Sequence, residues 1–349
     1  MRKLASIQKV WELEPIEGAD RIELAHVMGW QCVVNKDVFK PFDIGVYFEI
    51  DSFLPIRPEF EFLRSSSYKK SDILGEGFKL RTMRFKGVLS QGLFLPLSAF
   101  HEFDDIKNIE VGTDVTNMLG VRKWEIEERA TTGGNVIGTL PSFIPHTDET
   151  RVQENPELIN EFAGLDYYIS TKMDGSSHSI GVDEDGFHVT GHNYEYKDDD
   201  SSSFYRLVNE RNYREKIEKY YSQANLQSLT IQGEFCAPGI QKNRLKLSRP
   251  EWYVFTIMVN GSRVELNRML ELCDYLGLNH VPIEEVGTDL PLKYPTVEKL
   301  LERADGDYPN GGKKEGIVIR PVEPVFCKLI GSSLSMKVIN NSYLLKNDK

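Results

Sequence analysis

Short apolar runs separated by turn residues fill the stretch between residues 5 and 97. Short runs at regular spacing are typical of small antiparallel barrels, because these barrels are built from short strands joined by tight turns. The sequence therefore predicts a small β-barrel at the N-terminal end of the chain. Its strands are expected within residues 6–13, 22–28, 31–34, 46–50 and 92–95.

A different pattern begins near residue 145, where strand-like and helix-like runs alternate. Asn155, Pro156 and Glu157 supply an N-cap, a first-turn proline and an acid, which predicts the start of a helix. Apolar periodicity predicts further helices over 204–224, 264–276 and 297–304, and strands at 167–173, 186–190, 229–235, 253–259, 316–319 and 335–339. Such alternation predicts an α+β domain.

The length of 349 residues indicates two domains. Residues 125–144 are rich in glycine, threonine and charge and have no steady period, so they are expected to be a linker. The predicted division is a barrel over residues 1–124, this linker, and a second domain over residues 145–349.

Composition excludes several classes of protein. No apolar run is long enough to span a membrane, and the first residues lack the apolar core of a signal peptide, so a cytoplasmic protein without a membrane partner is expected. The four cysteines are scattered singly, which fits neither a disulfide framework nor a zinc site with paired ligands. The chain is expected to be a monomer.

The net charge of −11 argues against a protein that coats nucleic acid through its overall charge. Local basic clusters are still compatible with a nucleic-acid groove, and a solvated surface is the alternative interpretation. One such cluster makes Lys242, Arg244 and Lys246 candidate RNA contacts.

The segment Ser170-Thr171-Lys172-Met173-Asp174-Gly175-Ser176-Ser177 carries the main chemical signal. Lys172 and Asp174 are two residues apart at the end of a predicted strand, so they project from the same face, and Gly175 permits a sharp turn after them. Four further elements follow in order, at residues 233–235, 253–255, 314–320 and 335–339.

This order of elements resembles the covalent nucleotidyltransferase superfamily of DNA ligases, RNA ligases and mRNA capping enzymes, whose first motif is Lys-x-Asp-Gly. Segments 144–153, 238–243 and 340–346 look most like RNA ligases that carry an OB-type barrel ahead of an antiparallel-sheet catalytic domain. Residues 17–24 resemble the opening of tRNA-binding OB modules, which would place Phe39, Tyr68 and Arg84 in a nucleic-acid groove.

The resemblance implies an ATP-dependent RNA ligase that uses Mg²⁺ or Mn²⁺ and joins a 3′-hydroxyl to a 5′-phosphate in RNA repair. Lys172 would be the nucleophile that becomes lysyl-AMP, with Asp174 and Lys337 as further catalytic residues and Lys337 on the α-phosphate. Glu315 and Asp174 would bind the metal, Glu234 the ribose, and Phe255 would stack on adenine. The nucleotide pocket would also include Gly175, Ser177, His192, Asn193 and Val318.

The proposed nucleophile sets a physical condition on its surroundings. A lysine amine must be unprotonated to attack phosphorus, and its unperturbed pKa of about 10.4 leaves little free amine at neutral pH. Burial and a nearby divalent cation both disfavour the ammonium form. The sequence therefore predicts that Lys172 is buried beside a metal site.

Two positions depart from the pattern of the family. Gly191-His192-Asn193 stands where many of these ligases have Ser-Arg-Asn, so either His192 replaces the arginine or it is a surface residue. Ser335 stands where a lysine often precedes the last one, and Lys328 could supply the missing charge. A capping guanylyltransferase, a DNA ligase and a non-catalytic RNA-binding protein with this fold remain the alternatives.

Overall fold

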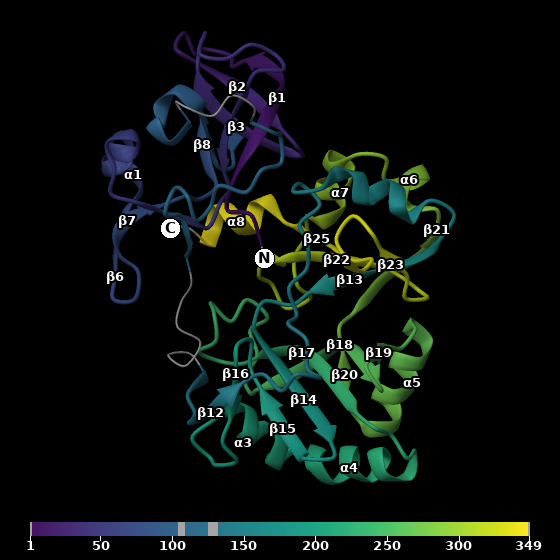
Figure 1. Ribbon diagram of the computed structural model, residues 1–349. Helices are drawn as coiled ribbons and strands as arrows, with labels where there is room; N and C mark the ends of the chain where they lie inside the picture. Colours follow the sequence, from purple (N-terminus) through teal and green to yellow (C-terminus); the bar gives the residue numbers. More distant parts are fainter. Residues whose placement is uncertain (1, 104–108, 125–131, 348–349) are drawn as a thin grey trace. The chain divides into compact units, whose positions relative to one another are not determined.

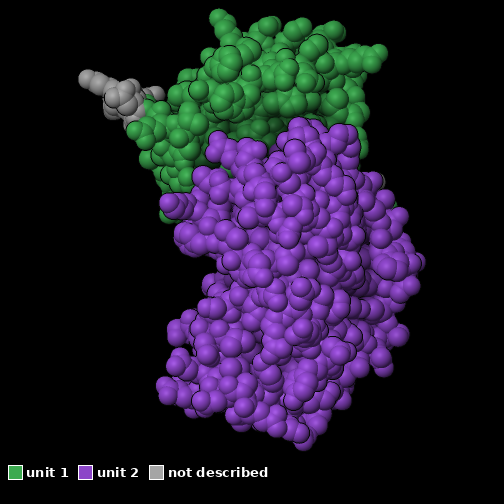
Figure 2. All heavy atoms as spheres, turned by 90° about the vertical axis from the view of Figure 1, so that its right-hand side faces the viewer, with its two compact units in different colours: residues 1–125, 153–156, 344–349 green, residues 126–152, 157–343 purple. Residues whose placement is uncertain are grey.

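The computed structural model describes residues 2–103, 109–124 and 132–347, which form two compact units. Unit 1 comprises residues 1–125, 153–156 and 344–349, and unit 2 comprises residues 126–152 and 157–343 (Figure 2). Part of the predicted linker, residues 125–131, lies outside the described residues. None of the described helices is long and apolar enough to cross a membrane.

Unit 1 contains the predicted antiparallel barrel. Its strands run in the order β10-β4-β1-β2-β3, and β10 also lies beside β3, which curls the sheet toward closure. The strands are β1 (Ala5–Pro15), β2 (Ile22–Val27), β3 (Trp30–Asn35), β4 (Ile44–Phe48) and β10 (Leu93–Pro96). All five expected strands are therefore confirmed.

The long connection between β4 and β10 adds structure that the sequence did not predict. It carries most of a four-stranded sheet of order β11-β5-β7-β6, and a hairpin of β8 (Met83–Phe85) and β9 (Val88–Ser90). The strands of this sheet are β5 (Ser52–Pro55), β6 (Tyr68–Ser71), β7 (Gly75–Lys79) and β11 (Arg122–Lys123), and the short helices of the unit are η1 (Pro58–Leu63), α1 (Arg64–Ser67), η2 (Leu97–Ala99) and η3 (His101–Phe103). Phe39, expected in a groove, is instead buried against Phe94.

Unit 2 is built on a large sheet of order β12-β16-β15-β14-β17-β18-β19, to whose β18 the short β20 adds in parallel. The strands are β12 (Val136–Thr139), β14 (Ser176–Asp183), β15 (Gly186–Thr190), β16 (Tyr194–Tyr196), β17 (Leu229–Cys236), β18 (Glu251–Val259), β19 (Ser262–Arg263) and β20 (Asn279–His280). Strand β14 was not predicted, although it lies at the centre of this sheet.

A second, four-stranded antiparallel sheet of order β21-β13-β22-β25 completes unit 2 (Figure 1). Its strands are β13 (Asp166–Lys172), β21 (Ile283–Thr288), β22 (Gly316–Pro321) and β25 (Met336–Ile339), and a hairpin of β23 (Phe326–Cys327) and β24 (Ser332–Ser333) lies between the last two. The two antiparallel sheets with their helices confirm the predicted α+β class.

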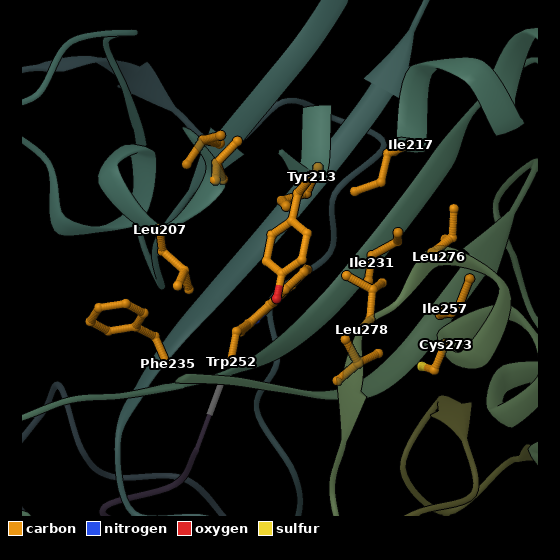
Figure 3. Packing of buried hydrophobic residues seen from close by; sticks show 14 of the residues in the cluster. Leu207, Tyr213, Ile217, Ile231, Phe235, Trp252, Ile257, Cys273, Leu276 and Leu278 are labelled. Carbon is orange, nitrogen blue, oxygen red and sulfur yellow. The ribbon is translucent and has the colours of Figure 1, made fainter. Parts of the chain in front are cut away.

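Helices α3 (Ser203–Glu210), α4 (Tyr213–Gln223) and α5 (Leu266–Leu276) cover one face of the large sheet (Figure 1). Leu207, Tyr213 and Ile217 of α3 and α4 pack against Ile231 and Trp252 of the sheet (Figure 3). This apolar layer makes the large sheet a firm base for the residues on its opposite face.

Some predicted helices differ from the observed ones. Residues 204–224 form α3 and α4 rather than one helix, because Asn212 between them has a left-handed φ of 53°. The helix expected after Asn155 is a 3-10 helix, η4 (Pro156–Phe162). The other helices in the described part of unit 2 and at its end are α6 (Leu290–Lys293), α7 (Val297–Ala304) and α8 (Asn341–Asn347).

Candidate active site

Lys172 is the last residue of β13, directly opposite Gly316 at the start of β22. Its Nζ lies 2.7 Å from an Oε of Glu315, and the two side chains are 23% and 18% exposed. The Tyr308 hydroxyl donates to the Lys172 carbonyl at 2.7 Å and accepts from the Glu315 backbone N–H at 3.1 Å. Tyr308 thereby fixes the backbone on both sides of the ion pair.

A cavity of about 200 Å³ surrounds this lysine within unit 2. Across the small sheet, Ser170, Val318 and Lys337 are cross-strand neighbours, so their side chains share the face of Lys172. The large sheet contributes Ser177 and Glu234, which are also cross-strand partners. The lining consists of Thr147, Asp148, Glu149, Ser170, Thr171, Lys172, Met173, Ser177, His192, Glu234, Phe255, Val281, Val318, Arg320 and Lys337.

A β-bulge in the large sheet brings Phe255 into the lining. In the pairing of β17 with β18, Gln232 lies opposite Thr256 and Gly233 opposite Val254, so Phe255 is the extra residue. Bulges of this kind change the direction of a side chain, and they are common beside active sites. Phe255 and Val318 therefore line one cavity from different sheets.

The carboxylates around Lys172 dominate the electrostatics. Burial alone would lower the pKa of Lys172, but Glu315, Glu234 and Asp174 together raise it above its ordinary value. Burial, with Glu315 and Asp174 adding to it, raises the pKa of Glu234 to about 8. In the protein alone, the site thus favours the ammonium, so the predicted lowering of the lysine pKa requires an added positive charge.

Asp174 has a different environment from the one predicted. Arg244 donates to one of its oxygens at 2.7 Å and the Tyr343 hydroxyl to the other at 2.7 Å, and the Asp174 side chain is 2% exposed. Asp174 does not line the cavity that holds Lys172. It anchors the turn after the lysine, and its predicted metal contact stays a prediction.

The same contacts correct the prediction for Arg244. Its side chain is 9% exposed and its guanidinium carbon lies 4.5 Å from the Tyr343 ring centroid, so it supports Asp174 instead of facing solvent for RNA. Lys242 and Lys246, on the same loop, are exposed.

Gly175 follows Asp174 and lies close to the backbone of strand β17. A Cβ at this position would collide with the Phe235 carbonyl oxygen, and the Gly175 N–H donates to Glu234. This glycine therefore allows the motif turn to lie against β17.

The two departures from the family pattern have different outcomes. His192 lines the cavity, and its Nε2 lies 3.8 Å from an Oδ of Asp148, whereas Asn193 is outside the lining. Ser335 is buried and accepts a hydrogen bond from Arg320 Nε at 3.2 Å. Lys328 is exposed and does not line the cavity, so it does not replace the missing lysine.

Several lining residues were missed by reasoning from sequence. Thr147, Asp148 and Glu149 lie in a segment that was noted for its resemblance but not assigned to the pocket. Arg320 ends the predicted fourth motif, and its approach to Phe255 depends on how the two sheets of unit 2 meet. An arginine inside a predicted buried strand was the available signal, because arginine is rarely buried without partners.

A barrel of OB type and two antiparallel sheets around a cavity that holds a lysine are the architecture of polynucleotide ligases and related nucleotidyltransferases. Residues 4–97 match the model of an OB-fold domain, and residues 165–339 match that of the RNA ligases. The chain belongs to the RNA ligase family. No curated protein matches it.

Solved structures of a Naegleria gruberi RNA ligase are similar over the whole chain. Its complex with PPi is 34% identical, covers 100% of both chains and has a TM-score of 0.88. A mutant with ATP and Mn is 33% identical over 99% of this chain and 98% of that one, with a TM-score of 0.86. Another mutant, with AMP and Mn, is 34% identical over 99% of each chain, with a TM-score of 0.87.

Proposed function

We propose that this chain joins RNA ends in three steps that begin with transfer of AMP from ATP to Lys172. The observation that supports this most directly is the position of Lys172 Nζ in a cavity lined by Glu234, Phe255, Val318 and Lys337. The Naegleria ligase with ATP, AMP and PPi in its structures supports the same nucleotide for this chain.

In the first step, the Nζ lone pair attacks the α-phosphorus of ATP, an N–P bond forms, and the bond to the bridging oxygen breaks as pyrophosphate leaves. The lysine must lose its proton, for which the Glu315 oxygen at 2.7 Å is the nearest acceptor. Lys337 places positive charge beside the α-phosphate, where negative charge develops in the transition state.

Phe255 and Val318 form the two walls of the adenine slot in this proposal, and Glu234 accepts from the ribose hydroxyls. Ser177 and His192 lie on the same lining and contact the sugar and phosphates. Gly175 and Asn193 act through the backbone around the slot, because neither lines the cavity.

The donor set fits a divalent cation. Glu315 and Glu234 bring two carboxylates to one lysine, and Mg²⁺ and Mn²⁺ prefer oxygen ligands, often one or two carboxylates with substrate phosphates. Glu315 is the main candidate ligand. A bound cation would offset the carboxylates that hold the proton on Lys172, and it would neutralise charge on the triphosphate.

In the second step AMP passes from Lys172 to the 5′-phosphate of one RNA end, and in the third a 3′-hydroxyl displaces AMP to form the phosphodiester. Lys242 and Lys246 are exposed on the loop that supports Asp174, which makes them candidates for contacts with RNA phosphates. RNA repair is the role that this chemistry would serve.

Incubation with α-labelled ATP and Mg²⁺ or Mn²⁺ tests the first step. A labelled protein band should survive denaturation, and Lys172→Ala and EDTA should each abolish it. Lys299→Ala is the matched control, because Lys299 is 56% exposed on α7 and pairs with Glu302. Full labelling of Lys172→Ala would contradict the proposal.

Other substrates distinguish the alternatives. Labelling by GTP instead of ATP would favour a capping guanylyltransferase, and labelling by neither would favour a non-catalytic RNA-binding protein. A panel of RNA, DNA and mixed junctions with labelled 5′ ends would then separate RNA joining from DNA joining.

A further inference from the structure

Arg320 connects the two sheets of unit 2 and lines the cavity that holds Lys172. It belongs to β22 and is 4% exposed, and one of its terminal nitrogens donates to the Phe255 carbonyl at 2.5 Å and to the Thr256 hydroxyl at 3.1 Å. Its Cζ lies 5.6 Å from the Phe255 ring centroid. The guanidinium therefore holds the bulge that carries Phe255.

The other donors of Arg320 reach two further segments. Its second terminal nitrogen donates to Glu149, and its Nε donates to the Ser335 hydroxyl of the turn before β25 at 3.2 Å. Ser335 also bonds to Glu149, which lowers the pKa of this half-buried carboxyl together with Arg320 and Arg263. Three other segments of the chain, around Glu149, Phe255 and Ser335, thus meet at the guanidinium of Arg320.

We propose that Arg320, Glu149 and Ser335 form a clamp that sets the spacing between Phe255 and Val318, and thus the affinity and selectivity for the nucleotide base. This inference rests on the proposed function, since it takes those two side chains as walls of the adenine slot. Arg320 also lines the cavity, and the role proposed for it is to position Phe255.

The clamp gives a physical reason for the departure at Ser335. Burial and the nearby Arg320 lower the pKa of Arg263 to about 10, and Glu149 is the carboxylate that attracts both guanidiniums. The Ser335 hydroxyl lies 3.2 Å from Arg320 Nε, so a lysine at this position would place a second cation beside the buried arginine. Like charges this close disfavour each other. The clamp and a lysine at this position therefore exclude one another.

A double-mutant cycle of Ser335→Lys and Arg320→Gln tests this coupling in the full-length protein. Each single variant should raise the KM for ATP in self-labelling about tenfold, while the rate at saturating ATP stays within about threefold, because Lys172, Glu315 and Lys337 are untouched. In the double variant the new lysine can pair with Glu149, so its KM should not exceed that of the worse single variant. Arg268→Gln is the control, since Arg268 is 48% exposed and pairs with Glu271 on α5.

Independent effects, which multiply to about a hundredfold in the double variant, would overturn the clamp. An unchanged KM with a smaller labelled fraction would also overturn it, because that pattern indicates only a loss of folded protein. If Ser335→Lys does not fold, Ser335→Ala takes its place. This variant removes only the acceptor for Arg320 Nε, so the KM for ATP should rise by less than about threefold.

If the unmutated protein itself does not label, the proposed function fails. The same coupling can then be measured by thermal unfolding of the unmutated protein, the two single variants and the double variant. If the double variant loses less stability than the two single variants lose together, the clamp is supported. If the two losses simply add, the clamp is contradicted.

Discussion

Tyr343→Phe removes one hydroxyl that donates to a buried carboxylate, and its effect on stability can be estimated from the structure. The bond to Asp174 is 2.7 Å long, and the Asp174 side chain is 2% exposed. A hydrogen bond to a charged group contributes about 1.5–3 kcal/mol. For a domain of this size, about 2–4 °C of Tm corresponds to each kcal/mol, so Tm should fall by about 3–12 °C.

The assay is thermal unfolding of the full-length protein, followed together with the fraction of enzyme that labels with AMP. Tyr275→Phe is the matched control, because Tyr275 is 64% exposed and its loss of a hydroxyl should change stability by less than about 0.5 kcal/mol. Arg244 still pairs with Asp174 in the variant, so the protein should fold. If Tyr343→Phe shifts Tm no more than the control does, the hydroxyl does not anchor the motif turn.

Two further predictions concern buried groups near the same turn. His178 is fully buried, and burial lowers its pKa to about 4. The neutral imidazole therefore gives its full stabilisation above the unfolded pKa of about 6.5. As pH falls from 6.5 to 4, about 3 kcal/mol of the free energy of unfolding should be lost. Urea unfolding of His178→Asn should show a flatter pH dependence over this range, and an equal slope would contradict the argument. Gly175→Ala should cost about 1–3 kcal/mol and reduce labelling, because the new Cβ would meet the Phe235 carbonyl, whereas Gly138→Ala has open space around it and should change neither. Equal labelling by the two alanine variants would show that the close approach is not required.

The strands that are easiest to predict are those whose apolar residues follow one another, such as β13 and β22. Strand β14 escaped prediction because its first four residues, Ser176 to Ser179, are all polar. The first two are nonetheless half-buried and the next two are buried. Its burial comes from its central place between β15 and β17, which is a tertiary property. Hydrophobic pattern cannot report burial of this kind.

The break between α3 and α4 shows the opposite error. The apolar pattern continues through residues 204–224, but Asn212 takes a left-handed conformation and starts a new helix. Asparagine tolerates this conformation better than most residues, so the break has a local cause that periodicity alone does not reveal.

The place of Lys172 in the cavity could be predicted from a short motif, whereas the contacts of its neighbours could not. Asp174 has two partners that are distant in sequence: Arg244 lies 70 residues after it and Tyr343 169 residues after it. Nothing local distinguishes a surface arginine from one that supports a buried acid, so Arg244 was assigned to RNA and Asp174 to the metal.

The contacts of Asp174 also bear on how the lysine is activated. Because Arg244 donates to one oxygen of Asp174 and the Tyr343 hydroxyl to the other, this carboxylate is held on the turn. Glu315, at 2.7 Å from Nζ, is the carboxylate left in direct contact with the amine. In the proposed first step Glu315 is the acceptor for the lysine proton, and a cation near this carboxylate would favour the free amine of Lys172.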